Sequence, residues 1–242
     1  MEALKNLKKT IRALKWYEWA MAAVMALIAV WAMAEAFLFP RAGGNPPWLT
    51  IVNFFSAIAG IFCVFFCAKA SVSTFFFGLV NTLTYIVYLW YWRIWGTMGL
   101  ELFLYLPMGI IGWLHWARHR DEKRRELAKA RSMRIWQLAL TAVAVAGFTV
   151  LFRWLLGLLD SNGEVAWLDA ATVAIGIVAT ALQTFRFREQ YLWWLITDVV
   201  TVAMYVVHFD PVYLTKRSIY LIVALLGLIN WVRLSRQNGE NR

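Results

Sequence analysis

An aspartate and a tryptophan one helical turn apart have the clearest capacity for chemistry in this chain. Trp194 and Asp198 lie on one face of the helix predicted by the apolar run 190–209. A carboxylate near the middle of a bilayer is costly unless it meets a cation, a hydrogen-bond donor or water. An indole beside that carboxylate can stack on a flat cationic ring, with the counter-ion behind it. The pair therefore predicts a site for an aromatic cation, although a purely structural role for Asp198 is the alternative.

Four further polar residues lie inside other apolar runs of the sequence. Asn81 and Tyr88 share one stripe of a predicted helix, and Gln183 and Asn230 lie in two later helices. Amide side chains at such depths can bind the hydroxyl groups or the amide of a ligand, and they can equally hold helices together. The candidate substrate-binding residues are therefore Gln183, Trp194, Asp198, Asn230, Asn81 and Tyr88.

The sequence contains no recognisable catalytic or metal-binding pattern. It has no glycine-rich loop ending in Lys-Ser/Thr, no His-Glu-x-x-His and no plausible Ser/His/Asp set. Cys63 and Cys67 lie four residues apart in an apolar run, and we interpret them as packing residues. We therefore predict no catalytic residue, no metal and no cofactor, and a binding protein is favoured over an enzyme.

The composition indicates an all-α polytopic membrane protein. Of the 242 residues, 62% are hydrophobic and only 16% are charged, whereas a soluble domain is about half apolar and a quarter charged. The net charge of +10 does not indicate nucleic-acid binding, because the basic residues lie between apolar runs and not on a soluble module. About eight spans are predicted, at residues 16–38, 48–68, 72–92, 98–117, 136–158, 165–185, 190–209 and 212–233.

The distribution of basic residues predicts the orientation. With the N-terminus inside the cell, five of the 24 Lys and Arg residues fall outside, namely Arg41, Arg93, Arg153, Lys216 and Arg217. Both termini are therefore predicted to be cytoplasmic. Lys216 and Arg217, at the outer start of the last span, fit this rule poorly. The polar stretch 118–135 is predicted to be a helical, solvated cytoplasmic connector.

An internal repeat predicts how the spans are grouped. Asn81 and Tyr88 match Asp198 and Tyr205, and the run from Tyr105 to Trp116 matches residues 220–231. A linker span between two three-helix units gives both units the same orientation, as in transporters built from parallel repeats. The predicted organisation is a basic amphipathic N-terminal segment (1–15), an accessory transmembrane helix (16–40), a first three-helix bundle (47–117), a cytoplasmic connector and linker helix (118–160) and a second three-helix bundle (164–236).

Three sequence runs resemble the Pnu-type vitamin transporters. They are Tyr105-Leu-Pro-Met-Gly-Ile-Ile-Gly-Trp-Leu-His-Trp116, Ala181-Leu-Gln-Thr184, and Glu189-Gln-Tyr-Leu-Trp-Trp194 followed by Asp198. The resemblance covers roughly residues 48–236. It implies the three-plus-one-plus-three fold of the SWEET sugar transporters with one extra helix at the N-terminus, in agreement with the 1+3+1+3 grouping above.

The resemblance also implies a function. The chain would take up nicotinamide riboside through the bacterial inner membrane by facilitated diffusion, with alternating access between the two bundles. The family often has Asn where Asp198 stands, which leaves thiamine or another B-vitamin open as the substrate. A membrane-embedded enzyme or an assembly subunit without transport activity is the other alternative. The expected partners are the vitamin and the lipid bilayer, a homo-oligomer is left open, and no nucleic acid is expected.

Overall fold

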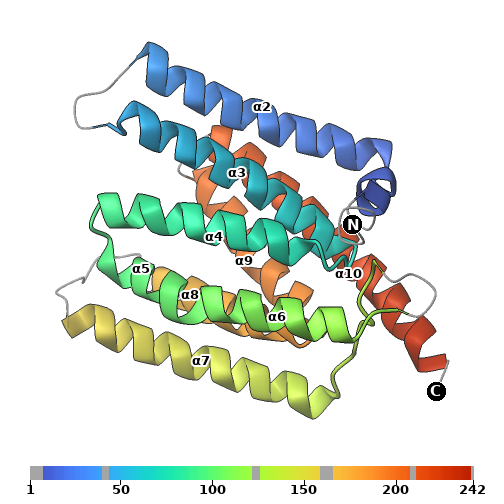
Figure 1. Cartoon of the computed structure of the whole chain (residues 1–242). Coiled ribbons are helices and arrows are strands. Elements are labelled where there is room, and N and C mark those ends of the chain that lie inside the picture. The colour runs from blue at the N-terminus through green and yellow to red at the C-terminus, as the bar shows by residue number, and fades with distance from the viewer. Residues whose placement is uncertain (1–7, 40–43, 122–125, 159–165, 208–210, 241–242) are drawn as a thin grey trace. The chain divides into compact units, whose positions relative to one another are not determined.

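The computed structural model describes residues 8–39, 44–121, 126–158, 166–207 and 211–240, and the regular structure within these ranges is helical (Figure 1). The helices are α2 (Trp16–Leu38), α3 (Pro47–Ala68), α4 (Thr74–Tyr91), α5 (Trp95–Leu100), the π-helix η1 (Glu101–Tyr105), α6 (Leu106–Arg118), α7 (Ile135–Leu158), α8 (Ala166–Thr184), α9 (Gln190–Val207) and α10 (Pro211–Glu240). Helices occupy all eight apolar runs in which spans are predicted.

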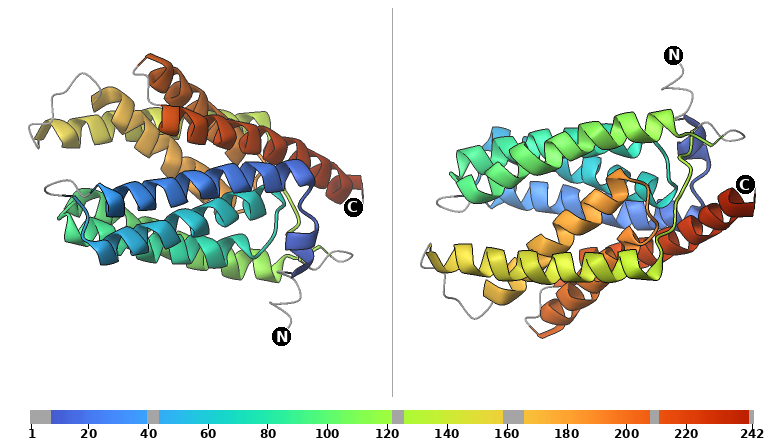
Figure 2. Two further views of the ribbon diagram at one scale, coloured as in Figure 1. Left: turned by 90° about the horizontal axis from the view of Figure 1, so that it is seen from above. Right: turned by 90° about the horizontal axis from the view of Figure 1, so that it is seen from below.

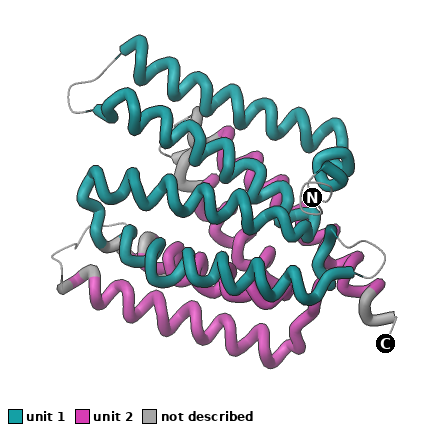
Figure 3. Tube along the Cα trace, in the orientation of Figure 1, with its two compact units in different colours: residues 1–129 teal, residues 130–242 magenta. Residues whose placement is uncertain are grey.

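The chain forms two compact units, residues 1–129 and 130–242 (Figure 3). In the first unit α2 packs on α3, α3 on α4, and α4 on α6. In the second unit α7 packs on α8, α8 on α9, and α9 on α10 (Figure 2). Each unit is therefore a series of helices in which each long helix packs on the next, and the predicted linker helix α7 belongs to the second unit.

The apolar side chains of several helices face outward. Six described helices are long and apolar enough to cross a membrane by length and composition, including Trp16–Leu38, Pro47–Ala68 and Ile135–Leu155. Ile135 is 89% exposed and Trp16 is 81% exposed. Exposure of such apolar side chains is unfavourable in water and is not unfavourable among lipid tails. The protein is therefore a polytopic membrane protein.

The fourth predicted span is made of three consecutive segments, α5, η1 and α6. Pro107 lies at the start of α6 and has no backbone N–H to donate, so a kink is expected there. The structure places the five-residue π-helical turn η1 directly before it, and the Leu106 N–H bonds to the Glu101 carbonyl. A π-turn beside a proline is a common way to interrupt the regular helical ladder.

The connector after α6 is extended, so the prediction of a helix over 118–135 is wrong for its described part. Its backbone pairs with the turn between α3 and α4, where the Ala128 N–H donates to the Ala70 carbonyl at 2.8 Å. On the second unit the Arg131 N–H donates to the Arg186 carbonyl, also at 2.8 Å. These bonds satisfy the backbone groups without a helix.

The described part of the N-terminal segment packs on the first unit. Thr10 is 2% exposed, and its hydroxyl lies 2.9 Å from that of Ser71. Leu14 is also buried. Residues 8–15 therefore contact the first unit, and residues 1–7 of the predicted segment lie outside the described part of the chain.

Candidate functional site

The internal repeat is visible as two equivalent packing motifs. Gly112 lies against the Phe75 ring and Gly227 lies against the Tyr191 ring, so closely that a β-carbon at either glycine would overlap the ring. The same rings also contact the tryptophan that lies one helical turn after each glycine. The ring centroids are 4.9 Å apart for Phe75–Trp116 and 6.0 Å apart for Tyr191–Trp231. Gly112 therefore lets α6 pack closely on Phe75 of α4, and Gly227 lets α10 pack closely on Tyr191 of α9.

The turns before these rings fix the alignment of the two units. Ala70 (φ 57°) and Arg186 (φ 65°) have left-handed backbones, and each precedes its aromatic residue, Phe75 or Tyr191, by five positions. On this alignment Asp198 corresponds to Thr82. The sequence match of Asn81 with Asp198 is therefore wrong by one residue.

Asp198 lies in α9 and is 6% exposed. Its Oδ1 atom is 3.8 Å from Nη1 of Arg217, which is in α10. This distance is that of an ion pair and is longer than a hydrogen bond. No described residue donates a hydrogen bond to the carboxylate, so Asp198 retains acceptor capacity for a ligand.

The first unit has a related pair at the equivalent level. Thr82 of α4 stands at the position that corresponds to Asp198, and Glu101 of η1 stands next to the one that corresponds to Arg217. The acidic residue therefore lies on the later helical segment, η1, in the first unit and on the earlier one, α9, in the second unit.

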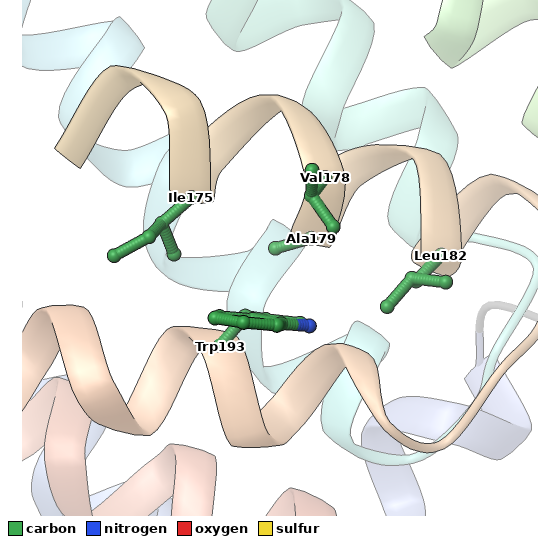
Figure 4. Packing of buried hydrophobic residues seen from close by; sticks show 5 residues of the cluster. All are labelled: Ile175, Val178, Ala179, Leu182 and Trp193. Carbon is green, nitrogen blue, oxygen red and sulfur yellow. The ribbon is translucent and has the colours of Figure 1, made fainter. Parts of the chain in front are cut away.

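Trp193 and Trp194 have different surroundings on α9. Trp193 lies under Ile175, Val178, Ala179 and Leu182 of α8 (Figure 4). Its indole N–H donates to Oγ1 of Thr141 in α7 at 3.3 Å. Trp193 is therefore a packing residue of the second unit.

Trp194 is half-buried and touches the edge of that cluster. It precedes Asp198 by four residues on the same helix, so the two side chains share a face. The structure thus separates a packing tryptophan from the one beside the carboxylate.

Two of the remaining candidates, Gln183 of α8 and Asn230 of α10, are half-buried in the second unit. Both already have interactions within the protein. Together with Trp194 and Asp198, they belong to three helices that pack in sequence, α8 on α9 and α9 on α10.

The two candidates in the first unit make contacts of their own. Nδ2 of Asn81 donates to the Ser56 carbonyl at 2.8 Å and to the Ser56 hydroxyl at 3.0 Å. Tyr88 stacks on Tyr85, with centroids 6.0 Å apart. Asn81 therefore joins α3 to α4, and its amide nitrogen is already used.

Sequence reasoning missed Arg217 as the partner of a buried carboxylate, Asp198. The signal for Arg217 was its poor fit to the charge rule, because a cation on the sparsely charged side suggests an internal partner.

The turn between α8 and α9 is strongly basic. Arg186 is 5% exposed, and burial, together with the nearby Arg131, lowers the pKa of its guanidinium to about 10. Arg188 donates from Nε to Oε1 of Glu189 at 3.0 Å. Among the described residues, no group of His, Cys, Asp and Glu is arranged to hold a metal ion.

An apolar exterior and two units built on one repeat are typical of a membrane transporter, and the second unit adds a buried carboxylate, Asp198. The chain belongs to the nicotinamide mononucleotide transporter family, whose profile matches residues 50–233. Membership of this family excludes the alternative of a membrane-embedded enzyme.

Individual relatives agree with this assignment. The chain is 31% identical to the nicotinamide riboside transporter PnuC of Neisseria mucosa, over 90% of this chain and 83% of that protein. It is 29% identical to PnuC of Haemophilus influenzae, over 88% and 90% of the two chains. The crystal structure of the vitamin B3 transporter PnuC superposes with a TM-score of 0.70 at 26% identity, over 97% of this chain and 98% of that one.

Proposed function

We propose that this protein carries nicotinamide riboside across the membrane by facilitated diffusion. The proposal rests on Asp198, a buried carboxylate one helical turn from Trp194. Its described ion-pair partner is Arg217, 3.8 Å away. A pyridinium ring needs an aromatic face and a counter-ion, and these two residues supply both. The relatives named as nicotinamide riboside transporters support the same substrate.

In this proposal the cationic ring stacks on Trp194 and competes with Arg217 for Asp198. Gln183 and Asn230 bind the ribose hydroxyls and the carboxamide. Asn81 and Tyr88 are the candidate substrate-binding residues of the first unit. Exchange of Arg217 for the substrate cation keeps the carboxylate compensated in both the empty and the loaded states.

The proposed arrangement in the membrane is eight spans in a 1+3+1+3 order, with both termini cytoplasmic in a bacterial inner membrane. The bundles alternate access to the two sides, as parallel-repeat transporters do. The skewed distribution of Lys and Arg supports the orientation. The number of chains in the working assembly is left open.

Calorimetric titration of the purified protein with nicotinamide riboside tests the site. We expect Asp198→Ala and Trp194→Ala each to weaken binding at least tenfold, about 1.4 kcal/mol. Trp154→Ala is the matched control, because Trp154 is 60% exposed on α7. Wild-type affinity in both site variants would contradict the assignment.

Thiamine is the second candidate substrate, and the same carboxylate favours it. Thiamine is also an aromatic cation, so a buried aspartate beside an indole suits it too. Competition of thiamine against bound nicotinamide riboside separates the two candidates. We expect thiamine to displace it only at concentrations at least tenfold higher.

A further inference from the structure

A cavity of about 440 Å³ lies in the second unit, among the start of α7, the start of α9 and the last turns of α10. It is separate from Trp194 and Asp198, neither of which lines it. All of its lining residues belong to residues 130–242. The cavity is therefore a feature of this unit alone.

The walls of the cavity are divided by polarity. Arg134, Arg188 and Arg236 line it together with Glu189. Arg188 is held in place, because Nε donates to Glu189 at 3.0 Å and Nη1 donates to the Ser235 hydroxyl at 3.1 Å. The Arg188–Glu189 pair is neutral overall, so the cavity retains the positive charges of Arg134 and Arg236.

Those two arginines are available to a ligand. Both side chains are exposed, and no described carboxylate lies within ion-pair distance of either. Guanidinium groups form paired hydrogen bonds with phosphate oxygens. The charge of the cavity therefore suits a phosphodiester anion.

The remainder of the lining is aliphatic. Leu138, Leu192, Leu228 and Val232 lie farther along the three helices, away from the charged ends. A cavity with a basic rim at the helix ends and an apolar floor toward the membrane interior matches a phospholipid, whose head group and acyl chain have the same order. A free phosphate ion would use only the rim.

The first unit lacks this combination. On the alignment fixed by the turns and by the Trp116–Trp231 match, Val72 and Ser73 stand where Arg188 and Glu189 do, and Asp121 stands where Arg236 does. Val72 is also 8% exposed. The arginines of the second unit are therefore not required by the repeated fold.

We propose that this cavity, lined by Arg134, Arg188 and Arg236 above Leu192 and Leu228, is a binding site for one anionic phospholipid of the surrounding bilayer. Arg134 and Arg236 bind the phosphodiester, while Arg188 is positioned by Glu189 and Ser235 at its edge. One acyl chain follows the aliphatic floor.

Native mass spectrometry of the full-length protein in detergent, titrated with dioleoylphosphatidylglycerol, tests this proposal. One tightly bound lipid is expected on the wild type, with an affinity about thirtyfold lower in Arg134→Gln/Arg236→Gln. Lys8→Gln/Arg118→Gln is the matched control, because it removes two exposed basic residues of the first unit. This control should bind like the wild type.

Two further experiments distinguish a specific lipid site from nonspecific electrostatic attraction of anions. Leu228→Trp fills the floor without changing the charge and should also weaken lipid binding, whereas inorganic phosphate should not displace the lipid. Any one of four results would overturn the proposal. These are an equal loss of lipid binding in both double variants, wild-type binding by Leu228→Trp, displacement of the lipid by inorganic phosphate, and equally tight binding of dioleoylphosphatidylcholine.

Discussion

The second unit joins α9 to α10 through Asp198 and Arg217, whereas the first unit has Thr82 on α4 and Glu101 on η1 at or next to the corresponding positions. The two pairs of residues stand at similar places in one repeated packing scheme. Only the second contains an ion pair, and only there does a tryptophan precede the acidic residue by one turn. The comparison teaches that the repeat preserves the scaffold, while the charge at its centre differs between the units.

The largest effect should come from the glycines that both units share. Gly112→Ala and Gly227→Ala each drive a β-carbon into an aromatic ring, and we expect each to lower the free energy of unfolding by about 1–3 kcal/mol. Denaturant titration in micelles measures this loss. Gly147→Ala is the control, because nothing lies within 4 Å of its new carbon. An effect in one unit only would break the packing equivalence.

The next effect separates the two polar pairs. Arg217→Gln removes the competitor for Asp198, so we expect affinity for nicotinamide riboside to rise about fivefold, or about 1 kcal/mol. The unfolding free energy should fall by a similar amount, since Arg217 is partly exposed and its pair is correspondingly weak. Thr82→Val, at the equivalent position of the first unit, should leave affinity unchanged. A weaker affinity in Arg217→Gln would mean that Arg217 binds the substrate itself.

A smaller effect is expected where Asn81 meets Ser56. Ser56→Ala removes the hydroxyl that accepts from Asn81 at 3.0 Å but leaves the carbonyl contact at 2.8 Å. We expect a loss of about 0.6 kcal/mol in unfolding free energy. Thr84→Val, whose hydroxyl bonds only within α4, is the control. A loss of transport without a loss of stability would instead indicate that Ser56 contacts the substrate.

The smallest effect concerns the turns that pair with the connector. Ala70 has φ 57°, so Ala70→Gly relieves backbone strain. We expect it to raise the free energy of unfolding by about 0.5 kcal/mol, which thermal unfolding detects as a slightly higher melting temperature. Arg186→Gly relieves the same strain but removes a buried side chain, so it should not stabilise the second unit. Equal stabilisation by Ala70→Gly and Arg186→Gly would contradict the expectation that only the Arg186 side chain contributes to stability.

The helices could be predicted from the sequence because their apolar runs are long and interrupted by charged or glycine- and proline-containing segments. The prediction 136–158 and the observed α7 (Ile135–Leu158) differ by one residue. The connector could not be predicted, because its composition suits a helix but its backbone pairs with the turns at Ala70 and Arg186. Local propensity yields to tertiary hydrogen bonds in such segments.

The candidate residues were found because buried polar side chains are rare in apolar helices. The alignment of the two repeats was harder to find. Asn81 and Asp198 are both polar and both precede a tyrosine by seven residues, but they do not occupy equivalent positions in the fold. The turns at Ala70 and Arg186 reveal this one-residue difference. Left-handed backbones at non-glycine residues have no reliable sequence signal, and the correct alignment therefore required the structure.

The central claim is that the charge of Asp198 holds the cationic ring of the substrate. The most direct test compares the dissociation constants of nicotinamide riboside and of its reduced, uncharged form. We predict that the wild type and Glu101→Gln prefer the cation at least tenfold, about 1.4 kcal/mol, and that Asp198→Asn loses this preference. A preference that survives in Asp198→Asn would contradict the account.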